Sequence, residues 1–226
     1  MKLIPLLLLA FCLSTSAQTL DVIGDSYVQN HQRPQEETWH SKMAQQLGFT
    51  YHNLGKNGAS VAFDRTHDFN PRNPSQRWNF GPALWAKTHL LDPQADYVLI
   101  IGGHNDADKI GSSRDSLAMF CDSLQLLIDN VRQRCPNARI GYVTPWYCQG
   151  AGFKPVCKAI RRICRRNRIP VLWNYTSKSP IQVRDESFRR QYFQRPNDTA
   201  HLNAAGHDLF LPYALRWFRE KVMKRE

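Results

Sequence analysis

The chain has 226 residues, 42% of them hydrophobic and 22% charged, and its formal net charge at pH 7 is +11. This length suits one globular domain with a full core, and the sequence contains neither an internal repeat nor a low-complexity tract. The positive charge favours solubility and attracts anions, but it does not identify a partner.

The first seventeen residues have the pattern of a secretory signal peptide. Lys2 precedes an apolar run over residues 3–13, which is too short to span a bilayer, and small residues at 14–17 form a cleavage site. We therefore expect residues 1–17 to be removed and residues 18–226 to form the exported domain, in the periplasm or outside the cell.

A lipid anchor fits the start of the chain poorly. A lipoprotein would be modified at Cys12, but the bulky Phe11 stands directly before it. No second segment is a candidate for spanning a membrane. We expect no stable membrane anchor.

Apolar runs and amphipathic periods then alternate along the chain. The expected strands span 20–23, 49–54, 97–101, 139–144 and 169–173, and the expected helices span 34–47, 82–91, 113–134, 154–167 and 203–224. Residues 63–81 are expected to form a long surface loop, and Pro212 to kink or restart the last helix. This alternation predicts an α/β fold: a single-domain, flavodoxin-like three-layer sandwich with a five-stranded, mainly parallel sheet.

The helix over 154–167 has an unusually basic face. Its arginines lie opposite an apolar face, and they are Arg161, Arg162, Arg165, Arg166 and, just beyond, Arg168. No aromatic residues alternate with them, as they do in proteins that bind single-stranded nucleic acid. We interpret this face as solvated surface and expect no nucleic-acid partner.

Five cysteines follow the predicted cleavage site, so at least one thiol must be free. Cys121 and Cys135 are separated by about 21 Å of helical rise and cannot form a disulfide. Cys157 and Cys164 lie two helical turns apart and cannot pair either. The most plausible disulfide joins Cys148 to Cys157 across a glycine-containing loop. No spacing matches a zinc ribbon or a CxxC motif.

Three expected strands end in polar or glycine-rich turns, which carry Ser26, Gly58 and Asn105. Because the carboxyl ends of parallel strands share one edge of a sheet, these residues are expected to gather there. Asp198 and His201 follow the fifth strand and reach the same edge. Acyl transfer needs a nucleophile, a base, a group that orients the base, and donors for an oxyanion, and these residue types supply each role.

Together these blocks resemble the SGNH (GDSL) hydrolase superfamily over essentially the whole chain after residue 17. The blocks are Gly24-Asp25-Ser26, the glycine turn at Gly58, Gly103-His104-Asn105-Asp106 and Asp198-Thr199-Ala200-His201. The resemblance implies a secreted esterase with Ser26 as nucleophile, His201 as general base and Asp198 as its orienting partner. It implies an oxyanion hole made by the backbone N–H groups of Ser26 and Gly58 and the amide of Asn105, and it implies no cofactor.

Some assignments have rivals. Gly55 competes with Gly58, and His207 competes with His201, although its place within the last helix favours a structural role. A metal site on Asp198 and His201 would lack a third ligand at a suitable spacing. His104 and Trp146 are weak candidates for substrate contacts, and His104 is more simply interpreted as a bystander.

We expect a serine esterase that hydrolyses carboxylic esters through an acyl-enzyme intermediate, with an acylated carbohydrate as substrate and acetyl as the acyl group. Export and three tryptophans in expected loops, Trp78, Trp85 and Trp146, favour a sugar, because aromatic faces pack on sugar rings. The alternatives are a lipase or lysophospholipase of the same superfamily, and a catalytically inert carbohydrate-binding module.

Overall fold

The computed structural model describes residues 17–31 and 33–224, and the predicted signal peptide lies outside them except for its last residue. The central sheet consists of β1 (Thr19–Gly24), β2 (Thr50–Gly55), β5 (Tyr97–Ile101), β6 (Arg139–Val143) and β7 (Val171–Leu172). The strands lie in the order β2-β1-β5-β6-β7, and every neighbouring pair is parallel. This order confirms the flavodoxin-like prediction and places the switch point between β1 and β5.

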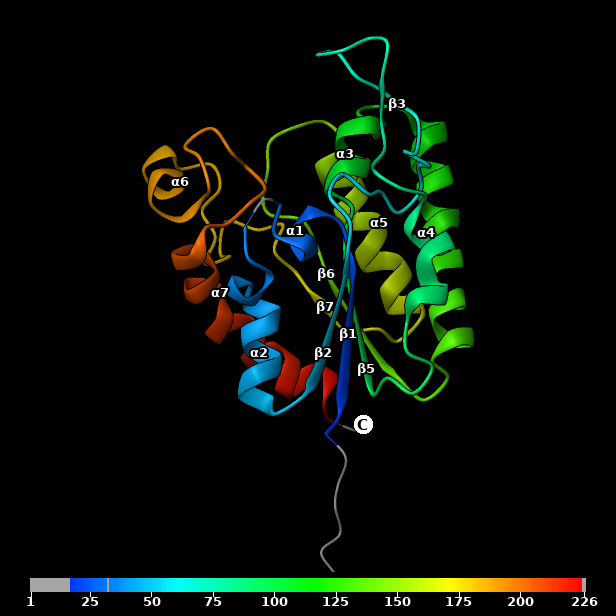
Figure 1. Ribbon diagram of the computed structural model, residues 1–226, viewed down its shortest axis with the longest axis vertical. Helices are drawn as coiled ribbons and strands as arrows, with labels where there is room; N and C mark the ends of the chain where they lie inside the picture. Colours follow the sequence, from blue (N-terminus) through cyan, green and yellow to red (C-terminus); the bar gives the residue numbers. More distant parts are fainter. Residues whose placement is uncertain (1–16, 32, 225–226) are drawn as a thin grey trace, which may run out of the picture.

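Helices cover both faces of the sheet (Figure 1). One face carries α1 (Ser26–Gln29), α2 (Trp39–Leu47) and α7 (Ala204–Trp217), and the other carries η2 (Leu84–Leu90), α3 (His104–Ile110), α4 (Arg114–Arg134) and α5 (Phe153–Arg166). Helix α2 packs against α7, and α4 packs against both η2 and α5. Strand β5 is buried along its whole length, as expected for a central strand covered on both sides.

The predicted elements differ from the structure chiefly at their ends. The predicted strand 169–173 contracts to two residues, because β7 pairs with β6 only at Val171 and Leu172. The predicted helix 34–47 begins with a separate 3₁₀ turn, η1 (Gln35–Glu37). Helix α2 starts only after Thr38, whose side chain caps it by accepting a hydrogen bond from the Ser41 N–H.

Other differences lie in the last third of the chain. Helix α6 (Glu186–Tyr192) lies between the last expected strand and the last expected helix, where the sequence predicts neither. Helix α7 continues through Pro212 without the expected restart and is followed by the π-helical turn η3 (Phe218–Val222). The side chain of Asn203 caps α7 by accepting from the Gly206 N–H.

The expected surface loop 63–81 contains a short hairpin. Its strands are β3 (Asp68–Phe69) and β4 (Arg77–Trp78), which pair antiparallel. The hairpin projects beyond the main body of the protein at the end where α3 lies (Figure 1). It therefore stands at the carboxyl edge of the central sheet.

The predicted disulfide between Cys148 and Cys157 is wrong. All five cysteines of the described residues are free. Both thiols are buried, and the Cys148 Sγ donates to the Thr199 carbonyl oxygen at 3.4 Å instead of facing a second sulfur. Burial raises the pKa of the Cys148 thiol to about 12, which makes it unreactive at neutral pH.

None of the helices in 17–31 and 33–224 is long and apolar enough to cross a membrane.

Candidate active site

Ser26 lies where β1 passes into α1. The chain turns sharply here, and a Cβ on Gly24 would stand 2.1 Å from the Ile101 carbonyl oxygen, so only glycine fits. The Asp25 side chain caps α1 by accepting from the Tyr27 N–H at 2.9 Å. Ser26 is thus the first residue of a helix, and its own N–H has no partner among the described residues.

Ser26, His201 and Asp198 form one hydrogen-bonded series. The His201 Nε2 lies 2.8 Å from the Ser26 Oγ, and the His201 Nδ1 lies 2.9 Å from the Asp198 Oδ2. Because a carboxylate only accepts, Nδ1 carries the proton and Nε2 is left to accept from the serine hydroxyl. The structure therefore brings together the three residues predicted as nucleophile, base and orienting acid, in a geometry suited to those roles.

Asp198 is held in its ionised form. Burial alone would raise its pKa, but the hydrogen bond and charge of His201 oppose this effect, and so do the backbone N–H groups of Ala200 and His201. These groups donate to the Asp198 Oδ1 at 2.8 and 3.0 Å. The pKa of Asp198 is lowered as a result, so the carboxylate stays charged and can orient the imidazole.

Trp146, a candidate substrate contact by sequence, lies inside the protein and lines a small cavity together with Ser26 and His201. Its side chain is buried, its ring stacks on Tyr27 with centroids 5.2 Å apart, and its Nε1–H donates to the Ala200 carbonyl oxygen at 2.8 Å. A sugar could not reach either face of this ring. Trp146 instead supports the backbone beside His201, a role that no sequence pattern indicates.

His104 also lies mostly inside the protein. Its Nδ1 lies 2.9 Å from the Tyr27 hydroxyl, and 12% of its side chain is exposed. Burial, with a smaller effect of the nearby His201, lowers the pKa of His104 to about 4, so the ring is neutral at neutral pH. These contacts favour the bystander interpretation over a substrate contact.

Gly58 is better suited than Gly55 to form the oxyanion hole. The Gly55 N–H is occupied, since it donates to the Asn53 Oδ1 at 3.0 Å, whereas the Gly58 N–H has no partner among the described residues. Gly58 has a φ of +75°, and a Cβ there would lie 2.4 Å from the ring of Phe80. Both the backbone conformation and the packing therefore require glycine.

Asn105 and Asp106 connect α3 to the Gly58 turn. The Asn105 Nδ2 donates one hydrogen to the Ala59 carbonyl oxygen at 2.8 Å, which fixes the amide and leaves its second hydrogen available. The buried Asp106 carboxylate accepts from the N–H groups of Val61 and Ala62, each at 2.9 Å. Burial raises the pKa of Asp106 to about 6 despite these bonds. Asp106 therefore holds the turn in place, a role that its motif position alone did not reveal.

His207 is structural, as its helical position indicated. Its Nδ1 accepts from the Trp39 N–H and its Nε2 donates to the Asn30 Oδ1, so neither nitrogen can serve as a base. Burial lowers the pKa of His207 to about 3, and the neighbouring His40, Lys42 and His201 add to this effect. A neighbour that sequence reasoning missed is His31, whose ring stacks on His201 with centroids 4.7 Å apart.

Asp198 and His201 were also considered as metal ligands by sequence, and the surrounding side chains bear on that alternative. No group of three or more His, Cys, Asp or Glu side chains in the described part of the chain is arranged to hold a metal ion. Asp198 is hydrogen-bonded to His201, and His201 is hydrogen-bonded to Ser26.

A hydrogen-bonded Ser-His-Asp series at the carboxyl edge of a parallel sheet is the arrangement that serine hydrolases use. The chain belongs to the GDSL-like lipase/acylhydrolase family, whose model matches residues 22–209. This match includes every residue of the predicted site. A search of curated protein sequences finds no significant match.

Solved structures share the fold. A protein from Lactobacillus plantarum matches with a TM-score of 0.72 and 16% identity over 91% of this chain and 98% of its own. A member of the lipolytic G-D-S-L family from Veillonella parvula matches with a TM-score of 0.63 and 15% identity over 90% and 99%. A family two carbohydrate esterase from Clostridium thermocellum matches with a TM-score of 0.61 and 15% identity over 91% and 64%.

Replacing Asn105 with alanine tests its predicted role as a donor to the oxyanion. We expect kcat for ester hydrolysis to fall by about 10²–10³, with a smaller change in KM, because the donor acts mainly on charge that develops in the transition state. Steady-state kinetics on p-nitrophenyl acetate would measure both constants. A rise in KM with kcat unchanged would instead make Asn105 a ground-state binding residue.

Proposed function

We propose that the protein is an exported serine esterase that hydrolyses carboxylic esters through an acyl-enzyme intermediate on Ser26. The observation that carries this proposal is the continuous hydrogen-bonded series from Asp198 through His201 to Ser26. Membership of the GDSL-like lipase/acylhydrolase family supports a hydrolase.

The geometry suggests the following sequence of steps. The Ser26 Oγ attacks the ester carbonyl carbon while the His201 Nε2 takes the hydroxyl proton. The imidazolium is stabilised by Asp198, and the oxyanion receives hydrogen bonds from the N–H groups of Ser26 and Gly58 and the Asn105 amide. Breakdown releases the alcohol, which leaves with the proton from His201. Water then attacks the acyl-enzyme by the same route and releases the carboxylic acid.

The space around Ser26 favours a short acyl group. The cavity that Ser26 and His201 line has a volume of about 10 Å³. That is room for roughly one water molecule, whereas a long acyl chain needs a deep apolar pocket. This side of Ser26 therefore offers no pocket for a long acyl chain, which supports a short acyl group over the lipase and lysophospholipase alternatives. The cavity does not extend to Gly58 or Asn105.

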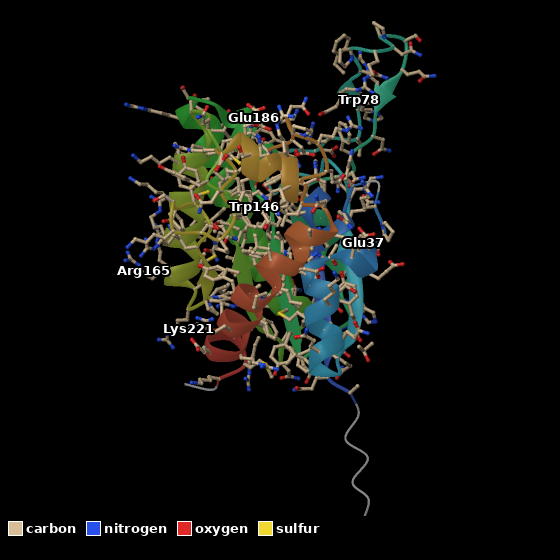
Figure 2. All side chains as sticks on the ribbon, turned by 90° about the vertical axis from the view of Figure 1, so that its left-hand side faces the viewer. Glu37, Trp78, Trp146, Arg165, Glu186 and Lys221 are labelled. Atoms are coloured by element: carbon tan, nitrogen blue, oxygen red, sulfur yellow. The ribbon has the colours of Figure 1, made fainter. Side chains whose placement is uncertain are left out.

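The β3–β4 hairpin supports a carbohydrate as the alcohol portion. Arg65 and Phe80, at the base of the hairpin, both contact Gly58: the guanidinium donates to its carbonyl oxygen, and the ring packs on its Cα. Phe69 on β3 is 58% exposed, and the partly buried Trp78 lies on the projecting hairpin, short of its tip (Figure 2). An exposed aromatic ring on a hairpin whose base contacts Gly58 suits a sugar, whose C–H faces pack on such rings. The fold shared with a carbohydrate esterase agrees with this proposal.

A substrate panel with one hairpin variant tests the proposal. We expect p-nitrophenyl acetate to be cleaved faster than esters of longer acyl chains, and acetylated xylan to release acetate. Phe69→Ala should lower kcat/KM on the acetylated glycan by about tenfold, the loss of one aromatic contact, and leave p-nitrophenyl acetate hydrolysis unchanged. Leu126→Ala, a similarly exposed apolar residue on α4, is the control. Faster hydrolysis of dodecanoyl than of acetyl esters would favour the lipase alternative.

Export rests on the predicted signal peptide at residues 1–17. Mass spectrometry of the protein recovered outside the cytoplasm is expected to find an amino terminus near Gln18. Recovery of the whole product in the cytoplasm with Met1 retained would contradict export without affecting the esterase assignment.

A further inference from the structure

A large groove lies at the edge of the sheet opposite the candidate active site. It has a volume of about 1030 Å³, larger than most small-molecule sites. The groove is formed by the ends of α4 and α5, the starts of β6 and β7, and residues 221–224. Figure 2 shows Arg165 and Lys221 along this side of the molecule, away from Glu186 of α6 at the upper end. We call it the basic groove.

The charge of this groove is of one sign. Seven cationic side chains of the described residues line it, and no carboxylate side chain within 17–31 and 33–224 does; they are Arg132, Arg139, Arg161, Arg165, Arg168, Lys221 and Lys224. None of the ion pairs found among the described residues involves any of them. The basic face of α5, expected to be ordinary solvated surface, is thus one wall of a concave site that attracts anions.

Two arginines are held in the groove by local structure. The Arg132 guanidinium donates to the Asn167 Oδ1 at 2.8 Å and also to its carbonyl oxygen, which fixes its direction. Arg168 follows α5 with a φ of +53°, a left-handed conformation in which glycine is favoured. This conformation is usual for the residue after a helix C-cap, and the Ile169 N–H closes the cap on the Cys164 carbonyl oxygen at 2.8 Å, so the backbone of Arg168 has a fixed place beside the groove.

The residues on the floor of the groove indicate which class of anionic ligand fits it. It is aliphatic, formed by Pro136, Ala138, Ile140, Ile169, Pro170, Val171 and Val222. No aromatic ring of the described residues lines it, and the ring of Trp173 next to it already has the Arg161 guanidinium over it, 5.3 Å from the centroid. The groove therefore lacks the series of open rings on which the bases of a single-stranded nucleic acid stack. The large exposed apolar side chains that could insert into a membrane lie elsewhere, at Phe69, Leu90, Met119, Leu126 and Leu209.

We propose that the basic groove binds an acidic polysaccharide at a site separate from the catalytic centre. Guanidinium groups on the rim would pair with carboxylate or sulfate groups in bidentate hydrogen bonds, while the C–H faces of the sugar rings pack on the aliphatic floor. The volume accommodates several sugar units. This site does not depend on the proposed esterase activity, and it would hold the protein on a charged glycan while the opposite edge stays open.

Two variants of one helix test the proposal. Arg161→Gln/Arg165→Gln removes two cations from the groove, and Arg162→Gln/Arg166→Gln removes two from α5 outside it. Both pairs change the net charge equally at the same spacing. Calorimetric titrations at about 0.15 M salt would use an oligogalacturonate, a heparin-derived oligosaccharide of equal length and an uncharged malto-oligosaccharide. Short single-stranded DNA and phosphatidylserine vesicles complete the set.

The proposal predicts that one of the two acidic oligosaccharides binds and the neutral one does not. The better ligand shows whether the anion is carboxylate or sulfate. The groove pair should weaken binding by about tenfold to a hundredfold, and the control pair by less than about twofold. Hydrolysis of p-nitrophenyl acetate should be unchanged in both. Should the groove pair fail to fold, Arg168→Gly is the substitute, expected to raise the melting temperature and still weaken binding.

Several results would overturn this assignment. Equal losses in the two pairs would show attraction by net charge rather than by the groove. DNA binding as tight as that of the oligosaccharides, with the same dependence on Arg161 and Arg165, would make the site a general polyanion surface. Groove-dependent binding to vesicles would make it a membrane contact. Failure of both acidic oligosaccharides to bind would remove the site altogether.

Discussion

Replacing Ser26 with alanine is expected to reduce ester hydrolysis by about 10⁵- to 10⁶-fold, the loss seen when a triad nucleophile is removed. The loss follows because, within 17–31 and 33–224, the Ser26 hydroxyl alone is hydrogen-bonded to the His201 Nε2, at 2.8 Å. Stability should change little, since the Ser26 Oγ makes no hydrogen bond other than this one among the described residues. Hydrolysis of p-nitrophenyl acetate and thermal unfolding of the same preparation measure the two effects.

Ser60 provides a matched control. It is a buried serine of the neighbouring turn, and its Oγ has no hydrogen-bond partner in the described structure. Ser60→Ala is expected to retain activity and labelling by a fluorophosphonate probe, whereas Ser26→Ala should lose both. Full activity of Ser26→Ala, or a wild-type protein that the probe does not label, would contradict the nucleophile assignment. The second result would favour an inert binding module.

The residues of the candidate site could be predicted because the topology of a parallel sheet brings together turns that are distant in sequence. Ser26 and His201 are separated by 175 positions, yet each follows a strand whose carboxyl end lies at one edge. Acyl transfer also requires only a few residue types, so few positions in the chain were candidates for each role. Their order along the chain therefore carried more information than any single motif.

The supporting residues could not be predicted in the same way. Trp146 supports His201 through the carbonyl oxygen of Ala200, and Asp106 fixes the Gly58 turn through two backbone N–H groups. Such roles depend on where the backbone of another segment passes, which has no periodic signal in the sequence. Trp146 was therefore predicted to be an exposed loop residue, because the sequence does not show that the backbone at Ala200 passes beside it.

The secondary structure was predictable where a regular pattern of apolar residues extends over many positions. Strand β5 and helix α4 match their expected ranges within a residue or two, because burial sets their pattern. Helices α1, α3 and α6 have four to seven residues, too few to establish a period. The hairpin in 63–81 pairs only two residues on each side, and composition alone does not reveal such a short ladder.

His201→Ala is expected to be nearly as damaging as Ser26→Ala, because the residues of a triad act as a unit. Without the imidazole, nothing accepts the serine proton, and Asp198 has no ring to orient. His207→Gln distinguishes this assignment from its rival: it removes a buried ring that bonds the Trp39 N–H and the Asn30 side chain, so it should lower the melting temperature and spare kcat of the folded protein.

The double variant Ser26→Ala/His201→Ala gives the sharpest form of this test. If the two side chains act in one step, the double variant should be no slower than Ser26→Ala alone, because the proton acceptor has no function once its donor is gone. Rates of p-nitrophenyl acetate hydrolysis for all four proteins measure the coupling. Losses that multiply would mean that His201 acts independently of Ser26. A larger loss of kcat in His207→Gln than in His201→Ala would identify His207 as the base.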